Sequence, residues 1–141
     1  MIKGLGHAAI KASDIEKSSK FYIETIGFKE AFRMTNPENG KVSMVYIYIA
    51  PGQFIELFPD GIGGLPGNND IGVKHLCVEV ENAAAFLEIL RAKGAPIDTE
   101  LKTGKSKCIQ FWTHDPDGNK IEFMELPPES LQAQANRRFA S

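Results

Sequence analysis

The sequence predicts an α+β fold made of two similar βαβββ modules, because the chain repeats itself. The early segment GHAAIKASDIEKSSKFYIETIGF has a counterpart in the second half, KHLCVEVENAAAFLEILRAKGAP. Each segment holds a histidine, a short apolar run, an amphipathic helix pattern and a glycine. Three landmarks recur at spacings of 68, 67 and 66 residues: His7 and His75, Gly27 and Gly94, and Glu56 and Glu122. Spacings this constant indicate a duplicated unit.

The first module is expected to begin with a strand over residues 5–12 and a helix that ends at Gly27. Ser13 and Glu16 have the spacing of a capping box, in which a hydroxyl and a carboxylate satisfy the first N–H groups. Ile15, Tyr22 and Ile26 form the apolar stripe that would face a core. Gly27 suits the left-handed conformation that ends many helices.

The remaining elements follow from alternating apolar residues and turn formers. Strands are expected over residues 28–35, 41–50 and 53–58, which completes a first module of residues 1–58. The glycine-rich segment 59–71 is a linker. The second module, 72–126, has a strand over 72–80, a helix capped by Asn82 and ended by Gly94, and strands over 96–102, 106–113 and 120–126. Residues 1–126 form one domain, and 127–141 is a polar C-terminal tail that is either a short helix or frayed.

Composition excludes several classes of partner. The net charge of −2 and the isoelectric point of 5.9 do not indicate a nucleic acid or a membrane surface as partner. No apolar run approaches the ~20 residues that span a bilayer, and no signal peptide is evident. We therefore expect a cytoplasmic protein that acts on a small molecule. Cys77 and Cys108 lie in apolar runs and are expected to be reduced core thiols.

The repeated histidines and glutamates are the candidate site. His7 and His75 lie in the first strand of their modules, and Glu56 and Glu122 lie in the last. A carboxylate between apolar neighbours is costly to bury without a partner. Two imidazoles and two carboxylates suit one divalent ion such as Ni, Zn, Co, Mn or Fe, and leave positions open for water or substrate.

The residues alone leave a second interpretation open. A strand histidine is often a hydrogen-bonded structural residue, and a strand glutamate often lies on the wet face. His114 precedes the Asp115-Pro116 turn, and we expect it to brace that turn rather than to bind metal. The recurrence of both residue types at equivalent places favours the metal interpretation for the four residues.

The two repeated segments, the block NPENGKVSMVYIYIAPGQFIELF and the ending HDPDGNKIEFMEL resemble the vicinal oxygen chelate superfamily, and within it glyoxalase I. The resemblance covers most of residues 4–126. It implies paired βαβββ modules that form a curved sheet with a cleft, and it places the metal ligands at His7, Glu56, His75 and Glu122. It also implies a homodimer. The DPDGN-x-IEF ending is specific for the superfamily rather than for one reaction.

The reaction implied by this resemblance is a glyoxalase I-type lyase reaction. A hemithioacetal of a 2-oxoaldehyde and a thiol, usually glutathione, is isomerised to a 2-hydroxyacyl thioester through an enediolate. One metal-bound carboxylate moves the proton between adjacent carbons. Glu122 is the first candidate for this base and Glu56 the second. Arg33 is a candidate for binding the anionic groups of the substrate, although an ordinary surface arginine fits the pattern as well.

Other functions in the superfamily remain open. Methylmalonyl-CoA epimerase has similar chemistry, but its pattern has an amide where Glu56 stands. Extradiol dioxygenases bind iron with two histidines and one glutamate, which would leave Glu56 surplus. Metal-dependent thiol transferases are a further possibility. Bleomycin-binding relatives have the same fold and need no metal, but they usually lack the ligand set that this chain retains.

Overall fold

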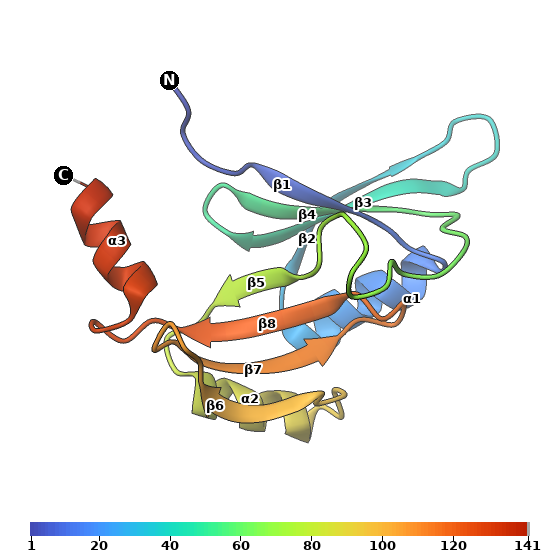
Figure 1. Ribbon diagram of the computed structural model, residues 1–141. Coiled ribbons are helices and arrows are strands. Elements are labelled where there is room, and N and C mark those ends of the chain that lie inside the picture. The colour runs from blue at the N-terminus through green and yellow to red at the C-terminus, as the bar shows by residue number, and fades with distance from the viewer. Residues whose placement is uncertain (141) are drawn as a thin grey trace. The chain divides into compact units, whose positions relative to one another are not determined.

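Residues 1–140 are described by a computed structural model, which divides into two compact units, Met1–Leu65 and Pro66–Ser141. Each unit contains one four-stranded sheet and a helix between its first and second strands (Figure 1). The α+β fold class and the βαβββ order of both halves are confirmed. Within residues 1–140, no helix is both long and apolar enough to cross a membrane.

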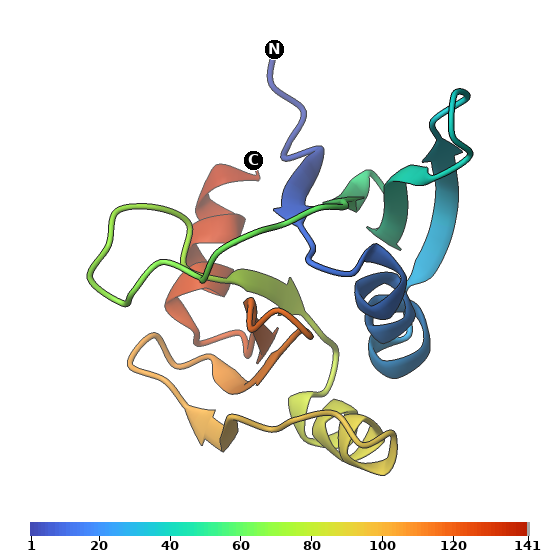
Figure 2. The ribbon, with the colours of Figure 1, turned by 90° about the vertical axis from the view of Figure 1, so that its right-hand side faces the viewer.

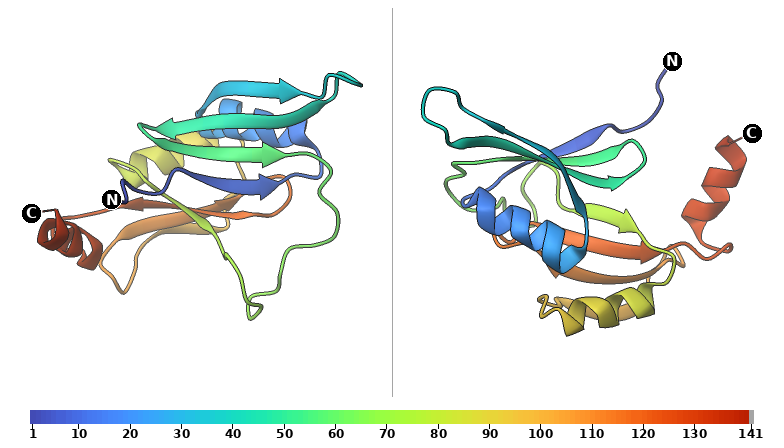
Figure 3. Two further views of the ribbon diagram at one scale, coloured as in Figure 1. Left: turned by 90° about the horizontal axis from the view of Figure 1, so that it is seen from above. Right: turned by 180° about the vertical axis from the view of Figure 1, so that it is seen from behind.

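The sheet of the first unit has the strand order β1-β4-β3-β2. Strand β1 pairs in parallel with β4, whereas β3 pairs in antiparallel fashion with both β4 and β2. Figure 3 (left) shows these four strands side by side. The elements are β1 (His7–Lys11), α1 (Ile15–Lys20), η1 (Phe21–Ile26), β2 (Lys29–Thr35), β3 (Val42–Ala50) and β4 (Gln53–Phe58).

The first helix begins one residue later than its capping pattern predicts. Asp14, rather than Ser13, is the N-cap, and its carboxylate accepts hydrogen bonds from the backbone N–H groups of Glu16 and Lys17. An aspartate at this position satisfies two otherwise unpaired donors and complements the helix dipole. The helix widens to π-type hydrogen bonding in η1, and Gly27 ends it at φ 96°, as predicted.

The core of the first unit lies between this helix and one face of the sheet. The predicted stripe residues Ile15, Tyr22 and Ile26 are buried. Ile55 and Leu57 of β4 are also buried, whereas Glu56 between them points to the opposite face. The buried strand residues of this unit are Val45, Ile47, Ile55 and Leu57. One face of β4 therefore stabilises the unit, and the other is available for chemistry.

The second unit repeats this topology with the strand order β5-β8-β7-β6. Strand β5 pairs in parallel with β8, and the other pairs are antiparallel. The elements are β5 (Leu76–Glu79), α2 (Ala83–Ala92), β6 (Thr99–Thr103), β7 (Ile109–His114), β8 (Lys120–Glu125) and α3 (Leu131–Phe139). The tail is therefore helical, and α3 buries none of its residues.

Helix α2 covers one face of the second sheet (Figure 2). The Asn82 side chain caps it by accepting from the Ala85 N–H, as predicted. Leu87 and Leu90 are buried, and the Phe86 ring lies 4.8 Å from the ring of Phe123 in β8. Because Phe123 faces the helix, its neighbour Glu122 faces the other side of the sheet, which is the arrangement seen for Glu56.

The turn before β8 is tight, as its composition predicts. Oδ1 of Asp115 accepts from the backbone N–H groups of Asp117 and Asn119, and Oδ2 accepts from the Asn119 amide. Gly118 has φ 86°, a conformation that favours glycine. The buried Asp115 carboxylate thus sets the direction in which β8 leaves the turn and carries Glu122.

The cap at Asp14 yields a stability prediction. We expect Asp14→Ala to lower the free energy of unfolding by about 1 kcal/mol, because two backbone N–H groups lose their acceptor. Asp14→Asn keeps an acceptor oxygen and is the matched control, with an expected loss of at most a few tenths of a kcal/mol. Urea unfolding followed by circular dichroism measures both. Equal losses for the two variants would show that the charge, and not the cap, is what stabilises the helix.

Candidate metal centre

The parallel strand pair β1–β4 brings His7 and Glu56 together in the first unit. His7 lies opposite Phe54 in the register, and Ala9 lies opposite Glu56. The histidine and glutamate are therefore diagonal neighbours on one face of the sheet. Nε2 of His7 and Oε2 of Glu56 are 3.4 Å apart. Two residues separated by most of the unit thus form one polar pair.

The second unit contains the equivalent pair. Cys77 lies opposite Glu122 in the β5–β8 register, and His75 directly precedes β5. Nε2 of His75 and Oε2 of Glu122 are 3.2 Å apart. The position of Cys77 relative to Glu122 matches that of Ala9 relative to Glu56. The repeat visible in the sequence is therefore a repeat of side-chain geometry.

In both pairs the carboxylate is the more buried partner. The side chains of Glu56 and Glu122 are 18% and 11% exposed, whereas those of His7 and His75 are 45% and 36% exposed. A carboxylate shielded to this extent needs a nearby positive charge or hydrogen-bond donor. A protonated imidazole or a bound cation at the histidine Nε2 would supply it.

The separations of 3.4 and 3.2 Å fit two donors on one metal ion. Donors that each lie about 2.1 Å from a divalent ion, at angles between octahedral and tetrahedral, are about 3.0 to 3.4 Å apart. Nitrogen and carboxylate oxygen donors suit Zn, Ni, Co, Mn and Fe. Each pair by itself supplies two ligands. Among residues 1–140, no group of three or more His, Cys, Asp and Glu side chains gathers into a possible metal site.

An aromatic side chain flanks each pair from the neighbouring strand. Tyr46 lies opposite Glu56, and Trp112 lies opposite Glu122. The Tyr46 hydroxyl is 2.9 Å from Nδ1 of His7, which leaves Nε2 directed toward Glu56. The Trp112 ring contacts the His75 ring edge-on at 4.8 Å. The two histidines are therefore oriented by different means, one by a hydrogen bond and one by ring packing.

The aromatic ring of Tyr46 is itself held in place. It stacks on Phe32 at 4.7 Å and contacts Phe54 at 5.3 Å. Sequence reasoning did not identify Tyr46, although the alternation in β3 places it on the same face as Glu56. What the sequence could not show is that its hydroxyl reaches His7.

The two cysteines occupy different environments. Both are free thiols; Cys108 is buried, as predicted, but Cys77 is exposed, so the prediction of a core thiol is wrong for Cys77. Cys77 shares the face of the sheet that carries Glu122, because it lies opposite that residue in the register. Protein atoms around its sulfur disfavour the thiolate and, together with the Glu122 charge, raise the pKa of Cys77 to about 12. A neutral thiol therefore lies beside the buried carboxylate near neutral pH.

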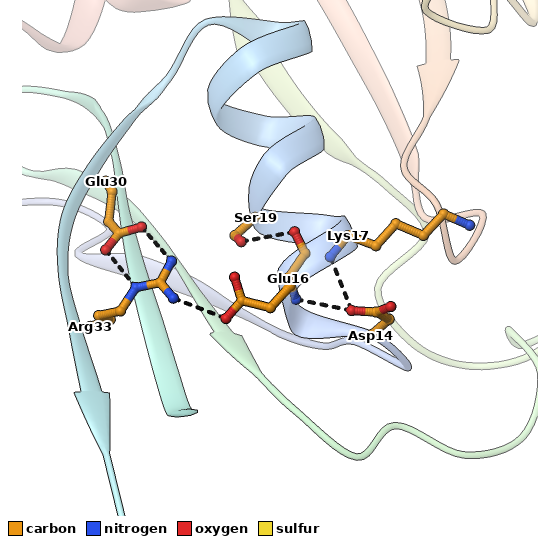
Figure 4. A network of polar contacts seen from close by, with 6 residues as sticks. All are labelled: Asp14, Glu16, Lys17, Ser19, Glu30 and Arg33. Atoms are coloured by element: carbon orange, nitrogen blue, oxygen red, sulfur yellow. Dashed lines mark hydrogen bonds and ion pairs between the residues drawn. The ribbon is translucent and has the colours of Figure 1, made fainter. Parts of the chain in front are cut away.

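Arg33, the predicted anion-binding residue, is engaged by two carboxylates (Figure 4). Its Nε and one terminal nitrogen each donate to Glu30 at 2.7 Å, and the other terminal nitrogen donates to Glu16 at 2.9 Å. Hydrogen bonding to Glu30 raises the pKa of Arg33, and the same bonds lower the pKa of Glu30. This network links β2 to helix α1. A role for Arg33 in substrate binding stays a prediction.

His114 does not brace the following turn, contrary to expectation. Its Nδ1 lies 2.7 Å from Oδ1 of Asp98, a residue just before β6. The turn is instead held by Asp115 through its own backbone and side-chain contacts. The sequence contains no local signal for the Asp98–His114 pair, because the two residues meet through pairing between β6 and β7.

Comparison with known proteins identifies the family. The pattern of the Glyoxalase/Bleomycin resistance protein/Dioxygenase superfamily matches residues 4–123. The chain belongs to this superfamily. Its members are mostly enzymes and commonly use a divalent metal ion.

Individual superfamily members with different activities are similar to this chain. Mitochondrial methylmalonyl-CoA epimerase from Mus musculus is 32% identical over 119 residues, which cover 80% of this chain and 66% of the epimerase. Lactoylglutathione lyase from Salmonella typhimurium is 32% identical over 125 residues, which cover 84% of this chain and 90% of the lyase. The chain thus spans somewhat less than two thirds of the epimerase and nearly all of the lyase.

Solved structures support the glyoxalase-like fold. A glyoxalase family protein from Enterococcus faecalis has a TM-score of 0.75 and 25% identity, with 87% of this chain and 98% of that chain covered. The protein SMU.1112c has a TM-score of 0.78 at 22% identity, with 89% of this chain covered and all of that chain. The predicted family resemblance is therefore confirmed.

The hydrogen bond from Tyr46 to His7 generates a prediction about metal affinity. Partners that orient a ligating histidine typically contribute 10–100-fold to metal affinity. We expect Tyr46→Phe to weaken binding of Zn²⁺ or Ni²⁺ by about tenfold or more. Tyr48→Phe is the matched control, because Tyr48 lies on the same strand and its ring contacts Phe54. Isothermal titration calorimetry measures both, and equal affinities for the two variants would contradict the orienting role.

The Arg33 network generates a prediction about pH. Because Arg33 lowers the pKa of Glu30 below its ordinary 4.5, the pair stabilises the fold at neutral pH. That stabilisation is lost as the pH falls below 4.5 and through the lower pKa of the folded state. In Arg33→Gln we expect the Glu30 pKa to rise toward 4.5, measured by NMR titration of its side-chain carboxyl. Lys17→Gln, which removes a nearby charge without touching Glu30, should leave that pKa unchanged.

Proposed function

We propose that the protein is a metal-dependent lyase of the glyoxalase I type. It would isomerise the hemithioacetal of a 2-oxoaldehyde and a thiol to a 2-hydroxyacyl thioester through an enediolate. The proposal rests on the register-matched His–Glu pairs, His7 with Glu56 and His75 with Glu122, whose separations of 3.4 and 3.2 Å suit ligands of one ion. Similarity to lactoylglutathione lyase along 90% of that enzyme supports it.

The proposed ligand set is His7, Glu56, His75 and Glu122. A divalent ion held by these residues would act as a Lewis acid, stabilising negative charge on adjacent oxygens of the substrate. Tyr46 holds the His7 ring so that Nε2 faces the carboxylate. Trp112 limits the His75 ring through an edge contact. Both histidines are thus oriented before any ion binds.

Glu122 is the proposed base. It accepts the proton from the carbon that carries sulfur and returns it to the neighbouring carbon, so that the substrate is isomerised without net proton transfer. Glu122 is the more buried of the two carboxylates, which limits exchange of that proton with water. Glu56, from the equivalent position, is the second candidate for this role.

A second candidate function is epimerisation of a 2-substituted malonyl thioester. The observation that favours it is the 32% identity with the mouse methylmalonyl-CoA epimerase, which equals the identity with the Salmonella lyase. The chemistry is related, because an epimerase also removes a proton next to a thioester carbonyl and returns it. Against it, the epimerase pattern has an amide where Glu56 stands.

The functional unit we propose is a cytoplasmic homodimer. Members of the superfamily typically dimerise. Sedimentation velocity of the purified protein tests this, with a mass of twice 15.5 kDa as the expected result. A monomer at micromolar concentration would contradict this part of the proposal without affecting the assignment of the base.

The central test combines metal analysis with substitution of the base. We expect purified protein to carry about one divalent ion per site and to convert the methylglyoxal–thiol hemithioacetal. Glu122→Gln keeps the size of the side chain but loses the proton acceptor, so kcat should fall by about 100-fold or more. Glu129→Gln, at an exposed glutamate beyond β8, is the control and should retain full activity.

The outcomes of this experiment separate the two candidates. Metal-dependent exchange of the proton at the 2-position of methylmalonyl-CoA, without turnover of the hemithioacetal, would favour the epimerase. Absence of bound metal from every preparation, and of activation by added Ni²⁺, Zn²⁺, Co²⁺, Mn²⁺ or Fe²⁺, would defeat both. Full activity of Glu122→Gln would move the role of base to Glu56.

A further inference from the structure

A pocket of about 420 Å³ opens on the second unit beside the turn that precedes β8. Its lining residues are Asp98, Thr99, Trp112, His114, Gly118 and Lys120. Trp112 lies opposite Glu122 in the register, and His114 lies opposite Lys120. Because Lys120 and Glu122 are two residues apart on one strand, they share a face of the sheet. The pocket therefore adjoins the His75–Glu122 pair.

The Asp98–His114 pair determines which hydrogen-bonding group the imidazole offers. Oδ1 of Asp98 is 2.7 Å from Nδ1 of His114, and a carboxylate oxygen accepts a hydrogen bond. Nδ1 therefore carries the hydrogen, and in the neutral imidazole Nε2 is an acceptor. Within residues 1–140, Nε2 makes no hydrogen bond. The pocket thus has an oriented acceptor at Nε2.

Lys120 supplies a positive charge to the same pocket. Its ammonium group donates one hydrogen bond, to the Asn68 side chain at 3.2 Å. An ammonium carries three hydrogens, so further donors remain for a ligand. Arg33 differs in this respect, because two carboxylates already receive its hydrogen bonds. Lys120 is thus the better-placed cation for an anionic ligand group.

The chemistry of the lining limits the ligand. One ammonium matches the single charge of a carboxylate better than the multiple charges of a phosphate, and the Asp98 carboxylate further disfavours a multivalent anion. The acceptor at Nε2 of His114 requires an N–H or O–H donor. The indole of Trp112 provides an apolar wall for the carbon atoms between these groups.

We propose that this pocket binds a carboxylate group with an N–H donor one carbon away, as at the C-terminal end of a peptide-like thiol. The carboxylate pairs with Lys120, the N–H donates to Nε2 of His114, and the intervening methylene lies against Trp112. This inference rests on the proposed function for the identity of the ligand as the thiol portion of the substrate. It makes the pocket a determinant of thiol specificity.

The test uses N-acetylglycine, which carries both groups, and metal-free protein in the presence of a chelator. Trp112 is the sole tryptophan of the chain, so its fluorescence and its single indole N–H resonance report on the pocket directly. We expect both signals to shift in a saturable way at millimolar ligand. N-acetylglycinamide, which lacks the charge, and inorganic phosphate, which lacks the donor and the methylene, should bind at least about tenfold more weakly.

Substitutions establish which side chains are responsible. Lys120→Gln should weaken N-acetylglycine about tenfold or more, whereas Lys120→Arg should retain binding. His114→Phe should weaken it as well, with circular dichroism used to verify that the variant is folded. Arg33→Gln is the control and should bind as the wild type does. Unchanged binding by Lys120→Gln, or equal affinity for the charged and neutral probes, would overturn the proposal.

Failure of this inference is distinguishable from failure of the proposed function. Lys120→Gln should bind metal with wild-type affinity and, if the inference is correct, should raise the KM for a hemithioacetal of a carboxylate-bearing thiol more than that of 2-mercaptoethanol. A protein that binds metal and turns over hemithioacetals, but shows no response of Trp112 to N-acetylglycine, would retain its function and lose this subsite. A protein that binds the probe but no metal would retain the pocket and lose the function.

Discussion

The parallel pairing of the first and last strands within each unit is the constraint on which the remaining geometry depends. In β1–β4 and β5–β8 this pairing sets a glutamate diagonal to a histidine that is distant in the sequence. Strand periodicity then places the flanking residues of each glutamate in the core. A slip of one residue would turn Glu56 or Glu122 into that core and Ile55 or Phe123 out of it, so the burial of apolar side chains maintains the polar pair.

The two halves repeat this frame but differ in the groups around it. Tyr46 holds His7 through a hydroxyl, whereas Trp112 contacts His75 through its ring. Beside the glutamate, the first half has Ala9 and the second has Cys77. Because these neighbours differ in polarity, the equivalent carboxylates are not chemically equal. Duplication thus supplies a pair of similar ligand sets, and divergence at the adjacent positions gives one of them a different role.

Charge is distributed so that few cations are available near the pairs. Arg33 is neutralised by Glu30 and Glu16, which makes it a link between a strand and a helix. Lys120 retains donors and lies two residues from Glu122. The hydrogen-bonding state of each cation, rather than its presence in the sequence, decides whether it can meet an anionic ligand. This consideration separates two residues that composition treats alike.

The sequence by itself determined the elements, their order and the equivalence of the two halves, because hydrophobic periodicity, capping residues and glycine stops are local signals. It also identified His7, Glu56, His75 and Glu122, since the repeat marks equivalent positions without knowledge of their contacts. Tertiary structure alone decided that each histidine meets its glutamate at 3.4 or 3.2 Å, that Tyr46 reaches His7 and that Asp98 holds His114. These contacts join residues far apart in the chain, and they depend on strand register, which no local pattern specifies. The cap at Asp14 in place of Ser13 shows the same limit at short range, because two adjacent acceptors compete and the backbone geometry chooses between them.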